Sequence, residues 1–258
     1  MGIPIKTPEE IQAMIEGGQI LGYVLEETLK IAKPGVSTFE LDEFAENLIK
    51  EKDAKAAFKG YHGFPGTLCT AIDEVIVHGI PKKTDILQEG DLLTIDCGVI
   101  WKNMYTDAAR SIGIGEISKE KQQLLNTSKE ALNAAINLAR PGNHLNFIGK
   151  KIEEIVNKAG FKIIYDLTGH GIGKELHEKP IVLNYWEGNP GPILKEGMTI
   201  AIEPIFSTGT HKMKTLDDNW TIVTADNSIS VQEENTILIT QNNPTILTKT
   251  KDKNDLHK

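Results

Sequence analysis

Two carboxylates stand at the ends of apolar segments whose composition predicts buried strands. Asp96 follows residues 92–95 and Glu203 follows residues 199–202, and both segments are rich in aliphatic and β-branched side chains. A buried carboxylate without a partner costs several kcal/mol, so such groups are usually paired or bound to a metal ion. Two such acids brought together would repel each other, and we therefore expect a positive charge to lie between them.

Three more residues could complete a metal site. Asp107 lies on the predicted strand that follows Asp96, Glu234 lies on the last predicted strand, and His170 stands among glycines in the segment GHGIG. Glycine allows close approach of the backbone, and neutral imidazole is a common metal ligand. Four carboxylates carry four negative charges, which two divalent cations would balance.

This donor set has a definite chemistry. Two divalent ions about 3.5–4 Å apart can share a bridging water, lower its pKa and polarise a carbonyl group. Carboxylates with one imidazole suit Mn, Fe(II), Co or Zn better than Cu(I), which prefers thiolate ligands. Cys97 is adjacent to Asp96, but strand alternation is expected to turn its side chain to the opposite face of the sheet.

An internal repeat explains why the acids occur in pairs. The segment AKPG at 32–35 returns as ARPG at 139–142, and LQEGDLLTID at 87–96 returns as LKEGMTIAIE at 194–203, both at an offset of 107 residues (96 to 203). The repeat predicts two related halves, at about 5–112 and 113–241, each running helix, helix and then strands. Asp96 and Glu203 then converge on the axis that relates the halves.

The elements that position these residues form an α+β fold. Capping boxes, Thr7 with Glu10 and Ser37 with Glu40, predict the starts of two helices. Further strands are expected near 67–77, 104–112, 220–225 and 231–240. Since strands and helices do not alternate, we expect a curved antiparallel sheet covered by helices rather than a doubly wound parallel sheet. A single domain is expected over 1–248, followed by a polar tail at 249–258.

Composition excludes several classes of protein. The 258 residues carry a net charge of −8, whereas a general nucleic-acid clamp would be basic. No apolar run approaches the roughly 18 residues of a membrane span, and no N-terminal signal region is present. Only Cys69 and Cys97 occur, which favours a reducing compartment. We therefore expect a cytoplasmic protein that binds neither membranes nor a specific nucleic acid.

At these residues the sequence resembles the bacterial type I methionine aminopeptidases, which are pita-bread metallopeptidases of family M24. The resemblance runs from about Ile5 to Gln241 and is strongest in GHGIGKELHEKPIVLNY at 169–185, with further matches at 61–65 and 77–81. The order of the acids and the histidine, Asp, Asp, His, Glu, Glu, also matches. A lone GHG would be a weak signal, whereas the ordered set is strong.

The resemblance implies a role for each polar residue of the set. The implied ligands of two divalent ions, whose identity (Co, Mn, Fe(II) or Zn) is left open, are Asp96, Asp107, His170, Glu203 and Glu234. His78 would contact the scissile amide nitrogen, and His177 would steady the carbonyl oxygen as charge develops. Glu203 would also carry the proton. The implied reaction removes an N-terminal methionine before a small second residue, by attack of a metal-activated hydroxide.

The resemblance also implies a pocket for the methionine side chain. Its residues, with His78 and His177 at its polar end, are Phe58, Tyr61, His62, Phe64, Cys69, Leu176 and Trp220. An unbranched thioether fits an apolar pocket lined by aromatic rings. The chain departs from the family pattern at Leu167, Phe58 and Asn235, which puts the fine substrate preference in doubt but removes no metal ligand.

Two other functions remain open on sequence grounds. One is another pita-bread peptidase of the Xaa-Pro type, and the other is a non-catalytic binding protein on the same fold. The expected partners are the N-termini of nascent or finished polypeptides, and the chain is expected to be a monomer. Ribosome binding is left open by the sequence, since its small basic clusters, at 82–83 and 211–214, are of a kind that is more often just a solvated loop.

Overall fold

Two N-terminal helices begin at the predicted capping boxes. In the computed structural model, which describes residues 2–249, α1 spans Pro8–Ile31 and α2 spans Thr38–Glu51. The Thr7 hydroxyl accepts from the Glu10 amide at 3.3 Å, and the Glu10 carboxylate accepts from the Thr7 amide at 2.9 Å. Ser37 and Glu40 form the same reciprocal pair. These contacts satisfy backbone donors that the first turn of a helix leaves unpaired, and both predictions are confirmed.

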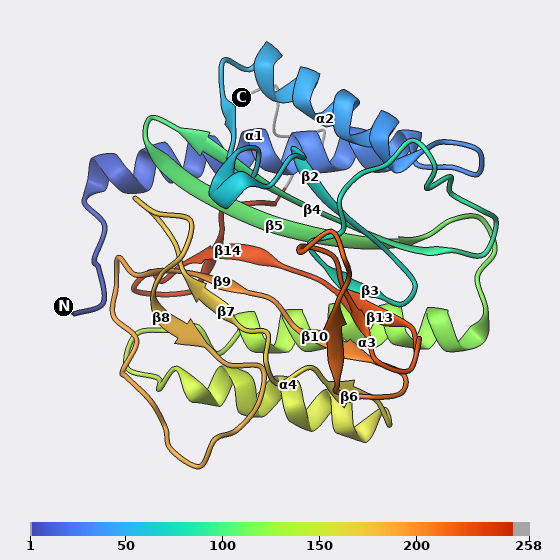
Figure 1. Cartoon of the computed structure of the whole chain (residues 1–258). Helices are drawn as coiled ribbons and strands as arrows, with labels where there is room; N and C mark the ends of the chain where they lie inside the picture. Colours follow the sequence, from blue (N-terminus) through green and yellow to red (C-terminus); the bar gives the residue numbers. More distant parts are fainter. Residues whose placement is uncertain (1, 250–258) are drawn as a thin grey trace.

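The first sheet is built around one long hairpin. Strands β4 (Leu92–Trp101) and β5 (Met104–Gly113) pair along their whole length, while β1 (Lys55–Ala56) and β2 (Leu68–Ile72) flank β4. Helices α1 and α2 lie over one face of this sheet (Figure 1). Leu21 and Leu25 of α1 pack with Ile95 and Cys97 of β4, and all four side chains are at most 1% exposed.

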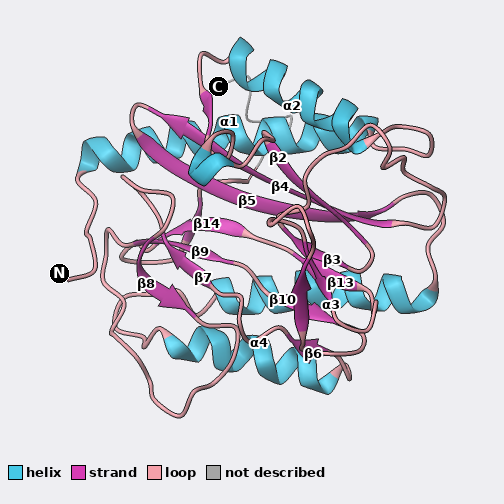
Figure 2. Ribbon diagram, in the orientation of Figure 1, coloured by secondary structure: helices cyan, strands magenta, loops and turns pink. Residues whose placement is uncertain are grey.

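The second half repeats this plan. Helices α3 (Lys119–Ile136) and α4 (Asn146–Lys158) lie on the opposite side of the molecule from α1 and α2, so the strands lie between two helical layers (Figures 1 and 2). They cover an antiparallel sheet in the order β15-β14-β9-β7-β8. Its strands are β7 (Gly169–Gly171), β8 (Glu178–Val182), β9 (Thr199–Ile202), β14 (Asn235–Leu238) and β15 (Thr245–Ile246).

Short strands connect the two halves. One small sheet contains β6 (Lys162–Ile163), β10 (Ile205–Ser207) and β13 (Ser230–Gln232), and the other contains β3 (Val75–Val77), β11 (Met213–Thr215) and β12 (Ile222–Thr224). A 3₁₀ turn, η1, spans Tyr61–Gly63. Because β12 of the second half pairs with β3 of the first, the halves share hydrogen bonds as well as apolar contacts.

The α+β fold with antiparallel sheets and helical cover is confirmed, with two corrections to the strands. The segment 67–77 is not one strand, because Asp73 has a φ of 51° and turns the chain between β2 and β3. The segment 231–240 is likewise interrupted between β13 and β14, and Glu234 lies in that interruption rather than on a strand. The predicted tail lies almost entirely outside the described residues.

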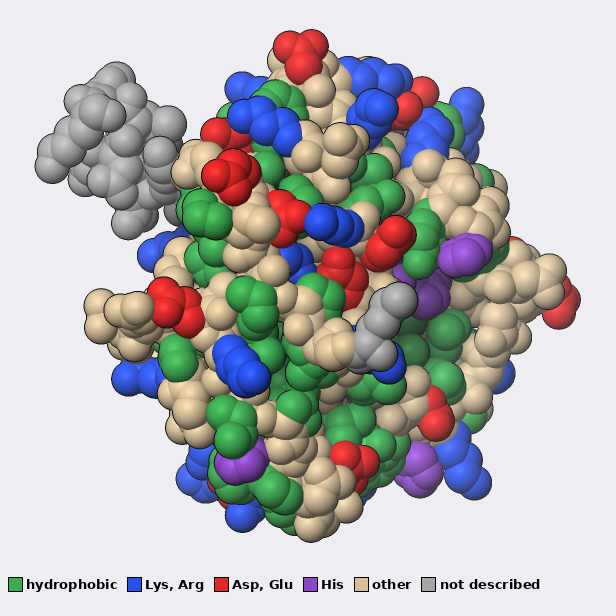
Figure 3. Space-filling model, turned by 90° about the vertical axis from the view of Figure 1, so that its left-hand side faces the viewer, with side chains coloured by type: hydrophobic (Ala, Val, Ile, Leu, Met, Phe, Trp, Pro, Cys, Tyr) green, Lys and Arg blue, Asp and Glu red, His purple; other side chains and the backbone are tan. Residues whose placement is uncertain are grey.

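Within residues 2–249, no helix has both the length and the apolar composition needed to cross a bilayer. On the face shown in Figure 3, acidic and basic side chains are interspersed with apolar ones rather than gathered by sign.

Candidate functional site

A cavity of about 300 Å³ lies where the two halves meet. Its lining residues come from both sheets and from the loops between them. They are Phe58, Tyr61, Phe64, Cys69, Val77, His78, Asp96, Asp107, Asp166, Leu167, Thr168, His170, Leu176, His177, Glu203, Ile205, Trp220, Gln232 and Glu234. Every sequence-predicted site residue except His62 is therefore part of one cavity. His62 is exposed outside the lining, with its ring 4.4 Å from that of Tyr61.

The backbone brings the four carboxylates together from different strands. Asp96 lies in the middle of β4 and Asp107 on β5. Glu203 follows β9 directly. Thr236 fastens β14 to β5, since its hydroxyl accepts from the Asp107 amide at 2.9 Å and donates to the Asp107 carbonyl at 2.8 Å. This clamp holds Asp107 close to Glu234.

Glycines place His170 against the same carboxylates. A Cβ atom at Gly169 would lie 2.4 Å from the Ala201 carbonyl oxygen, and one at Gly171 would lie 2.1 Å from the Lys179 carbonyl oxygen. Since real Cβ atoms do not approach oxygen so closely, only glycine lets β7 pack between its neighbours. This close packing explains why glycines flank the histidine in the GHG motif, and it places His170 in the cavity wall.

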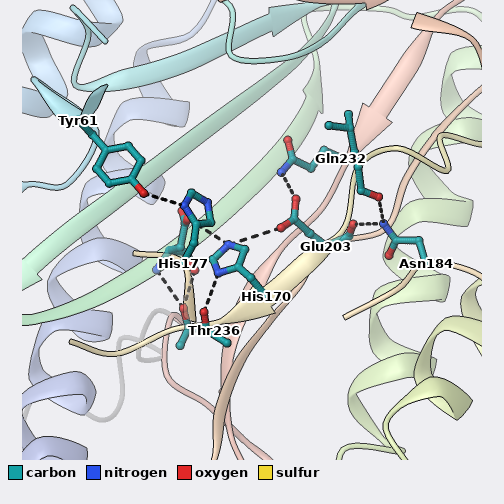
Figure 4. A network of polar contacts seen from close by, with 10 residues as sticks. Tyr61, His170, His177, Asn184, Glu203, Gln232 and Thr236 are labelled. Atoms are coloured by element: carbon teal, nitrogen blue, oxygen red, sulfur yellow. Dashed lines mark hydrogen bonds and ion pairs between the residues drawn. The ribbon is translucent and has the colours of Figure 1, made fainter. Parts of the chain in front are cut away.

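The donor atoms converge as a metal site requires. Ligand atoms of Asp107, His170 and Glu234 all lie within 4.8 Å of one another. The His170 Nε2 atom lies 3.6 Å from Glu203 Oε1 (Figure 4) and 3.9 Å from Asp107 Oδ2. One buried oxygen on each of Asp96, Asp107 and Glu234 has no hydrogen-bond partner. Unpaired buried oxygens are rare, so these three mark a place for cations.

The pKa values of these residues also favour a metal site. Burial and the neighbouring carboxylates raise the pKa of Asp107, Glu203 and Glu234 well above the ordinary range, and burial also raises the pKa of Asp96. Burial lowers the pKa of His170 to about 4, so its imidazole is neutral near pH 7 and can ligate a metal. A cluster of carboxylates with one neutral imidazole fits divalent cations of the Mn, Fe(II), Co and Zn group.

These shifts predict how metal ions affect stability. Because the pKa values of the carboxylates are raised on folding, the metal-free folded protein holds protons that the unfolded chain releases. Stability from this source is complete below about pH 4 and is lost as the pH rises through the folded-state values. Bound cations remove the repulsion between the ionised acids. The gain in Tm on adding metal should therefore be larger at about pH 8 than at about pH 5.5.

Calorimetry of chelated and metal-loaded protein at both pH values measures this difference. With free metal near 100 times its Kd, the stabilisation is about 2.7 kcal/mol, or about 5–10 °C for a chain of this size. An equal gain in Tm at the two pH values would mean that protons and metal do not compete for these carboxylates.

Two more histidines face the cavity. The Tyr61 hydroxyl lies 3.1 Å from His177 Nδ1, as Figure 4 shows, and His78 stands edge-on to the Trp220 ring at 6.3 Å. Both imidazoles are open to solvent at the cavity, yet the protein atoms around each ring replace enough water to lower its pKa. His78 also has a φ of 58°, a conformation that residues other than glycine adopt rarely and that clusters at functional sites.

The other end of the cavity is apolar. Phe64 and Trp220 meet edge to face at 5.1 Å, and Phe58, Cys69 and Leu176 are at most 8% exposed. Burial raises the pKa of the Cys69 thiol, so it stays neutral and behaves as a small apolar group. The other cysteine, Cys97, packs on the helix-covered face of β4, as alternation predicted.

Some lining residues escaped the sequence prediction. Gln232 is 2% exposed and donates from Nε2 to Glu203 Oε2 at 3.2 Å. It stands two residues before Glu234, and strand periodicity could have placed both on one face. Arg110 hydrogen-bonds the Glu234 carbonyl and the Asn235 side chain, and so supports the segment that carries Glu234. Asn235, which the sequence singled out only as a departure from the family pattern, therefore accepts a hydrogen bond from Arg110.

The chain is similar in sequence and in fold to known peptidases. Residues 12–241 match metallopeptidase family M24. The chain is 46% identical over 246 residues to the methionine aminopeptidase of Clostridium acetobutylicum, covering 95% of this chain and 98% of the relative. It is similar to the crystal structure of methionine aminopeptidase from Thermotoga maritima, with a TM-score of 0.94, 38% identity and coverage of 96% and 100%. A prolidase from Pyrococcus horikoshii OT3 aligns with a TM-score of 0.78 and 26% identity, but the match covers only 64% of that chain.

Proposed function

Because this chain belongs to metallopeptidase family M24 and has its pita-bread fold, we infer that it is a metal-dependent aminopeptidase that removes the N-terminal methionine from peptides and proteins. The observation that carries this conclusion is the cavity itself, in which four carboxylates and an imidazole lie beside an apolar, aromatic wall. The Xaa-Pro alternative is not favoured, since the prolidase match leaves about a third of that chain uncovered. A binding protein without catalysis would not need the complete donor set.

The polar end of the cavity carries the hydrolysis. Asp96, Asp107, His170, Glu203 and Glu234 would hold two divalent ions, a number supported by the four carboxylate charges and the unpaired buried oxygens. Ions bound there supply Lewis acidity, which activates water and polarises the substrate carbonyl. Glu203 would be the proton carrier, because its carboxylate lies beside the place of the ions and can take a proton from the water and pass it to the leaving amine.

The two solvent-facing histidines orient the substrate. When the Tyr61 hydroxyl donates to Nδ1 of His177, the neutral ring carries its proton on Nε2 and can donate to the carbonyl oxygen as negative charge develops. His78 contacts the scissile amide nitrogen from the Trp220 side. The methionine side chain occupies the apolar wall formed by Phe58, Phe64 and its neighbours, where an unbranched thioether contacts aromatic rings.

The proposed substrate range rests on the family to which the chain belongs. We propose that the substrates are free N-termini of nascent or finished polypeptides whose second residue is small, and that a monomer acts on them in the cytoplasm. The free cysteines Cys69 and Cys97 support a reducing compartment. Ribosome binding stays a prediction; in the 82–83 cluster, Lys82 pairs with Asp218 at 3.5 Å.

Peptide hydrolysis tests the function. Met-Ala-Ser and Met-Gly peptides should be cleaved, whereas Met-Leu, Xaa-Pro and N-formylated Met-Ala-Ser peptides should be left intact. The formylated peptide is the sharpest control, because it differs from the substrate only in lacking a free amino group. Preferential cleavage of Xaa-Pro peptides would replace this function with the prolidase one, and no cleavage of any peptide by metal-loaded protein would favour a binding protein.

The number of metal ions is open to a separate measurement. Asp107→Asn and Glu234→Gln each remove one charge from the cluster, and each should weaken binding of the second ion by at least about 10–100-fold, the loss typical of outer-shell changes alone. Calorimetric titration with metal gives both the stoichiometry and the affinities. Glu233→Gln is the matched control, since Glu233 is buried and adjacent in sequence but does not line the cavity. Full activity with one ion per chain at saturating metal would contradict the two-ion count.

A further inference from the structure

A buried ion pair connects the N-terminal segment to the loop that carries His177. Lys6 Nζ donates to Glu178 Oε2 at 2.6 Å, and the two side chains are only 2% and 9% exposed. In Figure 1 the N-terminal segment rises along the left edge of the molecule to the start of α1, on the same side as β7 and β8. Burying an ammonium group is costly unless its partner is well placed, so this contact calls for an explanation beyond surface charge pairing.

Glu178 organises the loop from within. Its second oxygen, Oε1, accepts hydrogen bonds from the backbone amides of Lys174 at 2.6 Å and Glu175 at 3.2 Å. The Glu178 carboxylate therefore closes a hydrogen-bonded loop over residues 174–178, and His177 lies within this loop. Lys6 supplies the opposite charge that holds this carboxylate in place.

The stem of Lys6 also packs directly on the loop. A Cβ atom at Gly173 would come within 2.1 Å of Lys6 Cε, so this position is restricted to glycine while Lys6 lies where it does. The Gly173 carbonyl accepts from the Tyr105 amide at 2.7 Å, which ties the loop to β5. The loop is thus held between Lys6 on one side and the first sheet on the other.

Lys6 is itself fixed to the sheet that carries Glu203. Its backbone amide donates to the Gly197 carbonyl at 2.8 Å, and the Gly197 amide donates to the Ile239 carbonyl at 2.9 Å. Strand β9 begins two residues after Gly197 and leads directly to Glu203. The position of the His177 loop is therefore set relative to the same frame that positions the carboxylates.

We propose that Lys6 is a positioning residue which, through Glu178, sets the place of His177 relative to the metal-binding carboxylates. This inference rests on the proposed function, in which His177 steadies the substrate carbonyl. A misplacement of about 1 Å can cost about 100-fold in rate, and loss of one oxyanion donor costs about 10²–10³. Loosening the loop should therefore lower the rate by part of that factor, while the metal ligands stay in place.

Substitution of Lys6 tests the proposal. Lys6→Met keeps the apolar stem and removes the charge; kcat on Met-Ala-Ser should fall about 10–100-fold, with KM and metal content unchanged. Lys6→Arg should restore most of the rate. The matched control is Lys174→Met, which removes an exposed ion pair with Glu10 from the same loop and should leave kcat within about twofold of the parent.

Two further readouts separate positioning from general stability. In a His177→Ala background, Lys6→Met should have little further effect on kcat, because the residue through which it acts is gone. Hydrogen exchange should be faster at the Lys174 and Glu175 amides in Lys6→Met than in the parent.

An equal loss of rate in both backgrounds, or an unchanged kcat in Lys6→Met, would overturn the proposal. Should Lys6→Met not fold, Glu178→Gln weakens the same contact, and its effect on kcat can be measured in the parent and in the His177→Ala background in the same way. A parent protein that fails to cleave Met-Ala-Ser would instead refute the proposed function, so the two failures are distinct.

Discussion

Glu203→Gln should lower kcat on Met-Ala-Ser by about 10²–10⁴-fold, the range for loss of a general acid–base group. The amide has nearly the shape of the carboxylate, and Glu203 is 8% exposed, so the change removes charge and proton capacity without opening a cavity. The variant should still fold, because removing one of several mutually repelling acids relieves the repulsion that raises their pKa values.

The measurement has to separate proton transfer from metal binding. Glu203 Oε1 lies 3.6 Å from His170 Nε2, so the variant also loses part of its metal affinity. We therefore expect the rate to stay low even when added metal restores full occupancy, as shown by metal analysis of the assayed sample. Glu233→Gln makes the same chemical change at a buried acid outside the cavity and should keep both metal content and kcat close to those of the parent. Recovery of parental kcat at full occupancy would make Glu203 a ligand only.

The carboxylates and the histidine of the cavity could be predicted from sequence because their chemistry is conspicuous. Asp96 and Glu203 each directly follow a run of apolar strand residues, where an acid is costly, and the internal repeat indicates that they belong together, although Asp96 lies in the middle of β4 and not at its end. The periodicity of β4 likewise separates Asp96, which faces the cavity, from Cys97, which packs under the helices. Helix starts were predictable for a similar reason, since a capping box is a local pattern that needs no knowledge of the fold.

Residues whose importance comes from long-range contacts could not be predicted in this way. Lys6 and Glu178 are 172 positions apart, and neither is unusual in its local sequence. Gln232 is an ordinary strand residue until Glu203 is brought next to it. His62 is the reverse case: it adjoins Tyr61 in sequence, but its backbone has a φ of 48° and its side chain does not line the cavity.

The role of the glycines around His170 could be predicted from sequence only in part. The pattern GHG predicted close backbone approach, but only the structure identifies the carbonyl oxygens of Ala201 and Lys179 as the groups approached. Those contacts come from β9 and from the chain at β8, so the histidine is held by the sheet on both sides. An alanine at either glycine would push β7 away from its neighbours and move the imidazole from the carboxylates.

His177→Ala should lower kcat by about 10²–10³-fold and leave metal content unchanged. The ring is anchored through Nδ1 by the Tyr61 hydroxyl at 3.1 Å, which leaves Nε2 for the substrate, and burial lowers the pKa of the imidazole so that it is neutral near pH 7. A neutral donor of fixed orientation stabilises charge that appears only in the transition state. The loss should therefore fall on kcat rather than on KM.

Variants of the other cavity histidines show whether this role is specific. His78→Ala should also spare the metal and slow catalysis, whereas His170→Ala should lose metal affinity directly, because the imidazole of His170 lies among the carboxylates. His144→Ala is the control, since His144 lies outside the cavity lining and contacts the Gly191 carbonyl. Tyr61→Phe keeps the ring and removes the anchoring hydroxyl, and it should reproduce part of the His177→Ala loss. If His177→Ala keeps its rate, or loses its metal along with its rate, then His177 does not steady the carbonyl, and the Tyr61 contact serves only to close the pocket.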